Sequence, residues 1–557
     1  MTGSRKGESV AQAERQKQDT GEWWRGAVIY QVYPRSFRDS NGDGIGDLPG
    51  LRAGLDHIAS LGVDAIWLSP FFVSPMHDGG YDVSDHCDVD PIFGTLADFD
   101  GLLADAHARG IRVIIDQVYS HTSSAHPWFQ EARRSRSANR ADWYVFADPR
   151  PDGTPPNNWQ SLFKGAAWSW CAERRQYYLH NFLAEQPDLN LHHPDVRAAI
   201  REIARFWLAR GVDGFRLDAV NFYCHDRRLR DNPPAGVAAA DRPYDYQRHL
   251  YNRSQPESLG VVEELRALAD EFDDRFLVAE VGDNAPISET IAYAWSGRPR
   301  RCHSAYDFAF LNGPRISADQ VHAAVLAWNE SGGAAWPSWA FSNHDVPRVV
   351  SRWAASETEE EDPRFASMLN ALLMGLKGTI FLYQGQELGL PQARLAREDL
   401  RDPEAIANWP ATLGRDGART PIPWEPEGEY GGFSDVRPWL PLDPRHRARA
   451  IARQETDPRS VLAVTRALIA LRRRQPALRH GDYAAITEAP APLVAFTRTD
   501  GATSLLCLVN PGEAPCDWRA PDFVRRWRHP LLAAEGVRLD AERYVLPAYG
   551  WAFLAAA

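Results

Sequence analysis

Four acidic residues end short apolar segments of the sequence. Asp116 closes VIID, Glu280 closes FLVAE, Asp345 follows WAFSNH, and Asp218 lies two residues after Arg216 in GFRLD. Residues two apart on a strand point to the same side, so Arg216 and Asp218 form either a structural ion pair or part of a working site. Four unpaired carboxylates in one pocket would repel one another, which favours paired or protonated groups and acid–base chemistry. Cleavage of a glycosidic bond requires two such carboxyl groups, one nucleophilic and one protonated.

Strand-like and helix-like segments alternate along most of the chain and would position these acids. The strand-like segments are apolar on both faces, and several amphipathic stretches end in Gly directly before the next strand. This pattern predicts an α/β fold, a (β/α)₈ TIM barrel, with a doubly wound open sheet as the alternative. The expected strands are 27–34, 63–70, 111–118, 212–220, 275–282, 339–343 and 379–385, and the clearest helical stretches are 48–62, 96–110, 194–211 and 257–272.

Two long irregular stretches interrupt the alternation. The first, rich in Trp, Asn and Pro, is too long for an ordinary loop and predicts an inserted loop-rich domain after strand 3. Short strand-like pieces near the end predict a C-terminal antiparallel β domain, a β-sandwich. The predicted division is a disordered tail (1–22), the barrel (23–121 and 187–480, with an irregular subdomain at about 386–458), the inserted domain B (122–186) and the C-terminal domain (481–557).

The composition of the 557 residues argues against several partners. With 62 Lys and Arg against 74 Asp and Glu, the net charge is −12, and we expect no nucleic-acid partner and no membrane partner. The six cysteines form no CxxC pair and the N-terminal stretch holds no apolar run, so we expect reduced thiols in a cytoplasmic protein, a monomer or homodimer. The 20 tryptophans indicate either large cores or flat surfaces for stacking a ligand.

Seven motifs occur in an order and spacing that resemble those of one known family. Four are DQVYSH (116–121), GFRLD (214–218), the VAEVGD segment around Glu280, and SNHD (342–345). Three more are GVDAIWLSP (62–70), QPDLN (186–190) and GTIFLYQGQELG (378–389). Together they resemble the α-amylase superfamily of glycoside hydrolases (family 13), and within it the α-glucosidase and oligo-1,6-glucosidase branch.

The resemblance implies a catalytic role for each acid at a strand end. Asp218 would be the nucleophile, and Glu280 the general acid and then the general base. Asp345 would stabilise the transition state through the 2- and 3-hydroxyls of the sugar. Arg216 would keep the nucleophile ionised, and Asp116 would orient Arg216 rather than act on the substrate.

The resemblance also implies a set of residues around the terminal glucose. Asp82 would pair with Arg415 at the closed end of the pocket and bind the 4- and 6-hydroxyls, while Tyr81 would stack on the ring. The alternative for this segment is a plain surface turn at Gly79–Gly80. The family usually carries Asn where this chain has Ser120, which leaves the local hydrogen bonding open. The implied substrate-binding residues are Tyr81, Asp82, His121, Arg216, His344 and Arg415.

An acidic loop, DSNGDGIGDLPG (39–50), carries oxygen donors at alternating positions like the first half of an EF-hand loop. Its twelfth position is Gly50 rather than Glu, and a strand rather than a helix is expected before it, which argues against an EF-hand sensor. The resembled glucosidases hold a structural Ca²⁺, sometimes assigned as Mg²⁺, in this loop. The alternative is an Asx-rich turn without metal. The implied ligands are Asp39, Asn41, Asp43, the Ile45 carbonyl and Asp47.

The expected reaction is release of α-glucose, with retention, from the non-reducing end of short α-glucosides. In the resembled branch Val after the nucleophile accompanies α-1,6 preference, so Ala219 favours α-1,4 substrates such as maltose. An alcohol can replace water in the second step, so transglucosylation is expected too. The alternatives are a sucrose or maltose glucosyltransferase or isomerase of the same family, and a non-catalytic relative, which the complete set of acids argues against.

Overall fold

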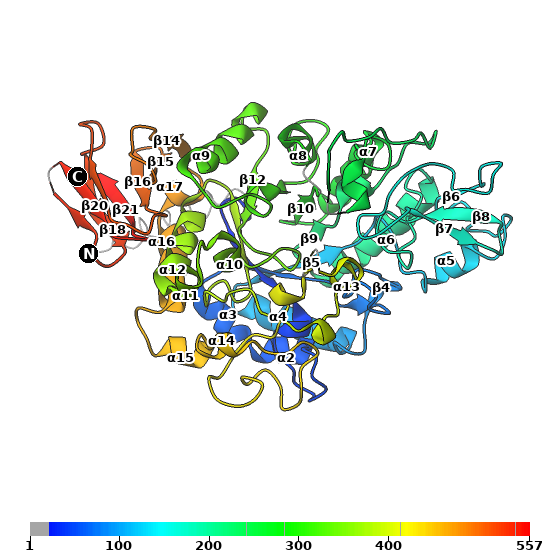
Figure 1. The fold of residues 1–557 in the computed structure, drawn as a ribbon, viewed down its shortest axis with the longest axis horizontal. Coiled ribbons are helices and arrows are strands. Elements are labelled where there is room, and N and C mark those ends of the chain that lie inside the picture. Colours follow the sequence, from blue (N-terminus) through cyan, green and yellow to red (C-terminus); the bar gives the residue numbers. More distant parts are fainter. Residues whose placement is uncertain are drawn as a thin grey trace, which may run out of the picture.

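A computed structural model describes residues 22–240, 242–282, 285–410, 412, 414–540 and 542–556. The predicted disordered tail lies outside the described residues except for Glu22. A central barrel has the inserted β6–β8 sheet at one end and the C-terminal sheets at the opposite end (Figure 1). Within the described ranges, none of the helices has the length and apolar character that crossing a membrane requires.

Eight parallel strands close into the barrel in chain order, which confirms the predicted fold. Inward-facing side chains fill its interior, including Trp67, Phe276, Tyr306 and Phe381, so the barrel is a packed core and not a pore. The strands are β1 (Val28–Val32), β2 (Ala65–Leu68), β5 (Arg112–Gln117), β9 (Gly214–Leu217), β10 (Phe276–Glu280), β11 (Ser304–Asp307), β12 (Pro337–Ala340) and β13 (Thr379–Tyr383).

One barrel strand, β11, has no counterpart among the expected segments. Its sequence SAYD is polar at both ends, yet all four residues are buried. Ser304 Oγ lies 2.6 Å from Ser338 Oγ and donates to the Trp336 carbonyl, so the polar group is satisfied inside the sheet. An apolar run was therefore not required there, and hydrophobic patterning alone could not find the strand.

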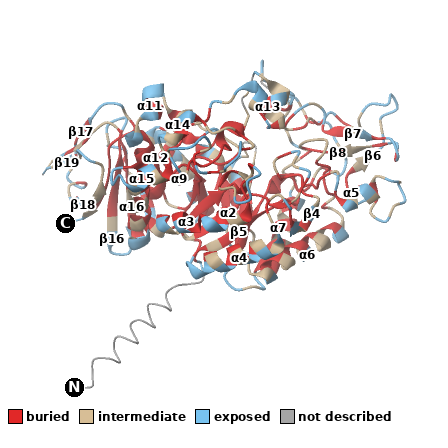
Figure 2. Ribbon diagram, turned by 90° about the horizontal axis from the view of Figure 1, so that it is seen from below, coloured by how far each residue is buried: buried red, intermediate tan, exposed pale blue. Residues whose placement is uncertain are grey.

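Helices cover the outside of the barrel, and the ribbon coloured by burial shows buried positions along them (Figure 2). The buried residues of these helices are mostly apolar and belong to the main core. In α6 (Pro194–Arg210), Pro194 occupies the first turn, Ile200 and Trp207 lie on the buried face, and Gly211 ends the helix with φ 105°. The other helices around the barrel are α2 (Leu48–Ala53), α3 (Leu55–Leu61), α4 (Leu96–Ala108), α7 (Glu257–Ala269), α8 (Ile287–Tyr293), α9 (Ala318–Ala327), α10 (Val349–Trp353), α11 (Glu357–Glu361), α12 (Pro363–Gly375), α16 (Val461–Arg474) and α17 (Pro476–Arg479).

Long segments leave the carboxyl ends of the strands, where the site lies. After β2 come β3 (Phe72–Val73) and β4 (Asp85–Val89), and after β5 come α5 (Pro127–Ala132) and a small antiparallel sheet of β6 (Phe146–Ala147), β7 (Trp168–Cys171) and β8 (Gln176–Leu179). After β13 come α13 (Pro403–Asn408), α14 (Pro444–Arg447) and α15 (Ile451–Glu455).

The C-terminal part is antiparallel, as expected, and consists of two sheets around their own apolar core. The first sheet holds β14 (Asp482–Ala485), β15 (Val494–Asp500), β16 (Thr503–Val509), β21 (Trp551–Ala556) and β18 (Trp527–Ala533). The second holds β17 (Cys516–Arg519), β20 (Arg543–Leu546) and β19 (Arg538–Leu539).

Candidate active site

Arg216 lies at the centre of the acids that end β5, β9 and β10. Its Nη1 donates to Asp116 Oδ1 at 2.8 Å and to Asp218, and its Nη2 lies 2.5 Å from Glu280 Oε1. The strand register sets this geometry, because Asp116 is the direct neighbour of Arg216 in the barrel. Burial lowers the pKa of Arg216, but the three carboxylates outweigh it and raise that pKa well above its usual value. One permanent cation therefore holds three acids together.

Burial raises the pKa of both Asp218 and Glu280, the two acids that Arg216 binds on β9 and β10. It raises the pKa of Glu280 to about 8, against the lowering effect of Arg216. It raises the pKa of Asp218 to about 7, again opposed by Arg216. Burial therefore raises the pKa of both acids, and a pair of this kind can supply a proton donor beside a carboxylate nucleophile.

A strained turn brings the backbone after Asp218 to Glu280. Ala219 has φ 42° and ψ 47°, a left-handed conformation that is uncommon for a residue other than glycine. Its amide donates to Glu280 Oε2 at 3.0 Å. Asn221 fixes the same two loops by accepting from the Gly282 amide and donating to the Gly282 carbonyl. The position of Glu280 therefore depends on the turn that follows the other acid.

Asp345 lies beyond the end of β12, and two arginines from the segment after β13 hold it. Arg419 Nη2 donates to Asp345 Oδ1 at 2.9 Å, and Arg415 Nη1 lies 3.5 Å from the same oxygen. Burial would raise the pKa of Asp345, but His344, Arg419 and Arg415 outweigh it and hold this pKa well below its usual range. Asp345 is therefore a fixed negative charge in the pocket.

Tyr81 and His344 form one stacked unit beside the acids. Their rings lie 5.3 Å apart at an interplanar angle of 8°, and the Tyr81 hydroxyl lies 2.6 Å from His344 Nε2. The same hydroxyl is 2.9 Å from Asp116 Oδ2, to which it donates. Burial lowers the pKa of His344 to about 3, so this imidazole is neutral.

His121 lies on the far side of the Tyr81 backbone. Its Nε2 donates to the Tyr81 carbonyl at 3.1 Å, which leaves Nδ1 as an acceptor for the Ser120 hydroxyl at 2.9 Å. Ser120 therefore satisfies the imidazole at the position where the chain departs from the family pattern. Gln186, in the QPDLN motif, lies 3.1 Å from the same Nε2 and donates to Asp78.

The predicted ion pair between Asp82 and Arg415 is wrong. Arg415 Nη2 donates to Asp78 Oδ1 at 2.7 Å, with both side chains buried. Asp82 is fully buried and accepts from the backbone amides of His77 and Asp78 and from the Ser74 hydroxyl. Its oxygens are occupied in shaping the Gly79–Gly80 turn, so Asp78 takes the place that the sequence analysis gave to Asp82.

Two further residues of this end of the site were missed. Asp402 accepts from Nε and Nη2 of Arg415 and lies directly behind it. Arg419, four residues after Arg415, holds Asp345. Both belong to the irregular segment after β13, where no periodicity or motif marks single residues. The only available signal was the number of charged residues around Arg415.

The pocket is a cavity of about 200 Å³ lined by residues from all these segments. Polar groups line one part of it: Asp78, Tyr81, His121, Asp218, Arg242, Glu280, Asp345, Glu404 and Arg415. Apolar groups line the rest: Leu162, Phe163, Ala219, Phe222, Phe182 and Phe308. The volume is below the roughly 300–1,000 Å³ of sites for drug-sized ligands, as suits a small sugar. The described lining contains no Trp; most tryptophans are buried in the core.

The loop at 39–47 is organised by its own side chains. Asp39 accepts from the amides of Asn41, Gly42 and Gly44, while Asn41 and Asp43 each accept from the amide two residues on. Asp47 caps α2 by accepting from the Gly50 amide and also accepts from Ser40. Oxygen donors of this type suit Ca²⁺. However, no three His, Cys, Asp or Glu side chains in the described ranges are grouped so as to hold a metal ion. The calcium site stays a prediction.

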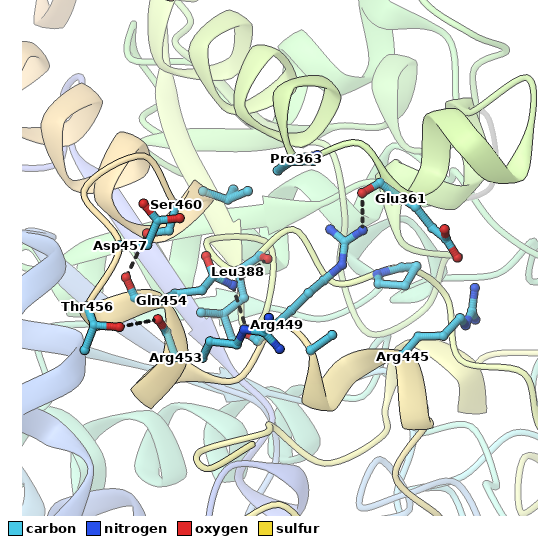
Figure 3. Close-up of a pocket in the computed structure, with 13 residues that line it drawn as sticks. Glu361, Pro363, Leu388, Arg445, Arg449, Arg453, Gln454, Thr456, Asp457 and Ser460 are labelled. Carbon is cyan, nitrogen blue, oxygen red and sulfur yellow. Dashed lines mark hydrogen bonds between the residues drawn. The ribbon is translucent and has the colours of Figure 1, made fainter. Parts of the chain in front are cut away.

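A separate cavity of about 610 Å³ lies away from the acids, between the start of α12 and the α14–α16 segment (Figure 3). Arg449 reaches across it and donates to the carbonyls of Glu360, Glu361 and Gly389. These three side-chain contacts stabilise the C-terminal end of α11 and a neighbouring loop. The residues lining this cavity are distinct from those lining the pocket of the acids.

A (β/α)₈ barrel with these acids at its carboxyl end defines a glycoside hydrolase. Residues 31–481 match the model of the alpha amylase catalytic domain. The chain is 53% identical over 499 residues to a probable alpha-glucosidase of Rhizobium meliloti (strain 1021), covering 88% of this chain and 90% of that protein. It is 35% identical to the oligo-1,6-glucosidase of Parageobacillus thermoglucosidasius, and the match covers 90% of this chain and 92% of that protein.

Solved structures agree with these matches. The alpha-glucosyl transfer enzyme XgtA aligns with a TM-score of 0.90 at 48% identity, over 96% of this chain and 99% of that one. The trehalulose synthase MutB of Pseudomonas mesoacidophila MX-45 aligns with a TM-score of 0.88 at 30% identity, over 96% of this chain and 99% of that one. The chain belongs to the alpha-amylase family of glycoside hydrolases, in its α-glucosidase and oligo-1,6-glucosidase group.

Proposed function

We propose that this enzyme is a retaining exo-acting α-glucosidase that releases α-glucose from the non-reducing end of short α-glucosides. The observation that carries the proposal is the shared guanidinium of Arg216, which binds the carboxyl groups of both Asp218 and Glu280. Retention requires two carboxyl groups about 5–5.5 Å apart, and two carboxyl groups bound to one guanidinium are consistent with such a short separation.

The proposed reaction has two displacements. The Asp218 carboxylate bonds to the anomeric carbon while the bond to the leaving oxygen breaks and Glu280 transfers its proton to that oxygen. In the second step Glu280 removes a proton from water, and the oxygen of that water displaces Asp218 from the anomeric carbon. Asp345, ionised between its arginines, stabilises the positive charge that develops on the sugar in both steps.

Exo action is supported by the closed end of the pocket. Asp78, Arg415 and Asp402 form a buried row of charges there, with Arg415 between the two acids. Such a row has fixed donors and acceptors for the hydroxyls of one terminal glucose, and it blocks a longer chain. Neutral α-glucosides of one or a few residues are therefore the proposed substrates.

The linkage preference and the acceptor are finer points of the proposal. Ala219 lines the pocket next to the nucleophile and its small side chain favours α-1,4 substrates such as maltose. Transfer of glucose to alcohols is supported by the similarity to a solved structure named as an alpha-glucosyl transfer enzyme. The similarity to a trehalulose synthase supports the second candidate, isomerisation or transfer starting from sucrose.

Product analysis distinguishes these candidates. Maltose, isomaltose, sucrose and maltotriose are each incubated with the enzyme, with and without an alcohol acceptor, and the products and their anomeric configuration are followed by NMR. The proposal expects α-glucose as the first product, faster from maltose than from isomaltose, and an alkyl glucoside when alcohol is present. β-Glucose would refute retention, and a rearranged disaccharide from sucrose without glucose release would favour the isomerase.

The proposal also includes a metal ion and a cellular location. We propose a structural Ca²⁺ in the loop that contains Asp39, Asn41 and Asp43, remote from the acids. We propose a cytoplasmic location, supported by six cysteines that are all free. Size measurements in solution decide between the monomer and the homodimer.

A further inference from the structure

A second cavity, of about 450 Å³, lies directly behind the glucose pocket. Asp402 lines this cavity and holds Arg415, which lines the glucose pocket; Arg419 lines the cavity and holds Asp345 on the other side. A single layer of ion pairs therefore separates the two spaces. The residues lining the rear cavity are Tyr33, Arg35, Met76, Gly79, Asp399, Arg401, Asp402, Pro403, Asp416, Arg419, Arg437, Pro438, Trp439 and Pro441.

Arg35 is the unusual residue of this rear cavity. Its guanidinium carbon lies 4.4 Å from the centre of the Trp439 ring, and its side chain makes no hydrogen bond or ion pair with any residue that the structure describes. Nε is buried without a partner, and burial lowers the pKa of the group. Arg35 is half-buried, and its terminal nitrogens remain accessible from the cavity without a partner among the described residues, so an anion that enters the cavity can bind them.

The acids near Arg35 are engaged elsewhere. Asp416 accepts from the backbone amides of Arg401 and Asp402, and Asp90 accepts from those of Ser74 and Ile92. Both act on Arg35 only through space, beyond ion-pair distance. They therefore do not neutralise this guanidinium directly.

Two further donors of the rear cavity are available. Arg419 uses Nε and Nη2 on the His344 carbonyl and Asp345, and its Nη1 has no partner among the described residues. Arg401 is exposed, and its side chain makes no ion pair within the described ranges; its one polar contact is with the Leu400 carbonyl at 3.5 Å. The positive charges of Arg35 and Arg419 repel each other, and this repulsion contributes to the lowered pKa of Arg35. An anion between them would offset the repulsion.

We propose that the rear cavity binds a small oxyanion, a phosphate or a carboxylate, with Arg35 as its main anchor and Arg401 and Arg419 as additional donors. Planar guanidinium groups match the geometry of such oxygens and pair with them strongly when water is excluded. The volume leaves room for an organic group attached to the anion. Because an anion on Nη1 shares the charge of Arg419 with Asp345 and weakens its hold on that carboxylate, occupancy lowers the rate of glucoside turnover.

Binding is measured first without any substrate, so that the result does not depend on the proposed reaction. Inorganic phosphate is titrated into the full-length protein by calorimetry at constant ionic strength, and glucose 6-phosphate and glucuronate are compared to distinguish phosphate from carboxylate. We expect saturable binding of at least one probe. Arg35→Gln should weaken it at least about tenfold, Arg35→Lys less, and Arg453→Gln, at the separate cavity, not at all.

Turnover provides the second readout. Hydrolysis of an aryl α-glucoside by the wild type should fall as the bound probe saturates, while Arg35→Gln should keep its basal activity and lose this inhibition. Thermal unfolding of Arg35→Gln checks that the fold is retained; if it is not, Arg401→Gln replaces it. No saturable binding of any probe, or equal binding by the wild type and a folded Arg35→Gln, would overturn the proposal.

Discussion

Asp78 and Arg415 are 337 positions apart in the sequence, yet they form a buried ion pair with 2.7 Å between Oδ1 and Nη2. Asp402 approaches the same Nη2 from the other side, also at 2.7 Å. The guanidinium therefore cannot turn away from the pocket without leaving a buried carboxylate unpaired. This pair fixes the closed end of the site.

Asp78 and Asp82 allow a matched comparison, because both flank the same glycine pair. Asp78→Asn weakens the hold on Arg415 and should lower kcat/KM for an α-glucoside about 10- to 100-fold. Asp82→Asn removes acceptors from a buried turn and should mainly lower stability, by about 1–3 kcal/mol. Kinetics and thermal unfolding of both variants test this. If Asp82→Asn lost more activity than Asp78→Asn while staying folded, the assignment from the structure would be wrong.

Asp218→Asn keeps the shape of the side chain but removes the nucleophilic oxygen anion. We expect kcat on an aryl α-glucoside to fall by a factor on the order of 10⁴ or more, because no covalent intermediate can form. Unfolding temperature and circular dichroism serve as the control for folding. Hydrolysis at close to the wild-type rate by a folded variant would show that Asp218 is not the nucleophile.

The activity should depend on pH through the two acids at Arg216. Asp218 must be ionised, which its pKa of about 7 permits only above that pH, and Glu280 must be protonated, which its pKa of about 8 permits only below. The rate should therefore rise toward neutrality and fall in the alkaline range. Glu280→Gln should remove the alkaline limb and lower kcat about 10²- to 10⁴-fold for poor leaving groups, but less for a nitrophenol.

Glu280→Gln should also change stability with a defined sign. The folded pKa of Glu280 is raised above the unfolded value of 4.5, so the folded state binds the proton more tightly and the glutamate loses stability as pH rises from about 4.5 to about 8. The neutral amide carries no such cost. The variant should therefore gain in unfolding temperature relative to the wild type as the pH rises. A constant difference across this window would contradict the raised pKa.

Calcium at the 39–47 loop is testable by stability alone. Stripped protein should gain about 2–3 kcal/mol of stability at calcium concentrations one hundred times the Kd, and its unfolding temperature should rise with concentration. Asp43→Ala should abolish the shift, because it removes one of the proposed calcium ligands. Asp47, not Asp43, caps α2, so this substitution leaves the helix cap intact. Asp273→Ala, an exposed acid in the turn between α7 and β10, is the matched control. An unchanged unfolding temperature of the stripped wild type would refute the site.

The barrel and the convergence of Asp116, Asp218, Glu280 and Asp345 could be predicted from local sequence patterns. Parallel strands of a closed barrel end at one rim, so acids that end apolar strands must meet there. Strand β11 was not predicted because it has polar residues at both ends and therefore lacks an apolar pattern. Hydrogen bonds inside the fold satisfy Ser304 and Asp307.

The closed end of the pocket, in contrast, could not be predicted from the sequence, because long-range contacts build it. Asp78 and Asp82 are the same residue type within two positions of the Gly79–Gly80 pair, and the choice between them depends on which carboxylate the local amides occupy. Asp402 and Arg419 come from an irregular segment whose path is set by contacts with distant residues. Local patterning therefore identified the reacting acids, whereas long-range packing selected the residues that hold the sugar and the acids in place.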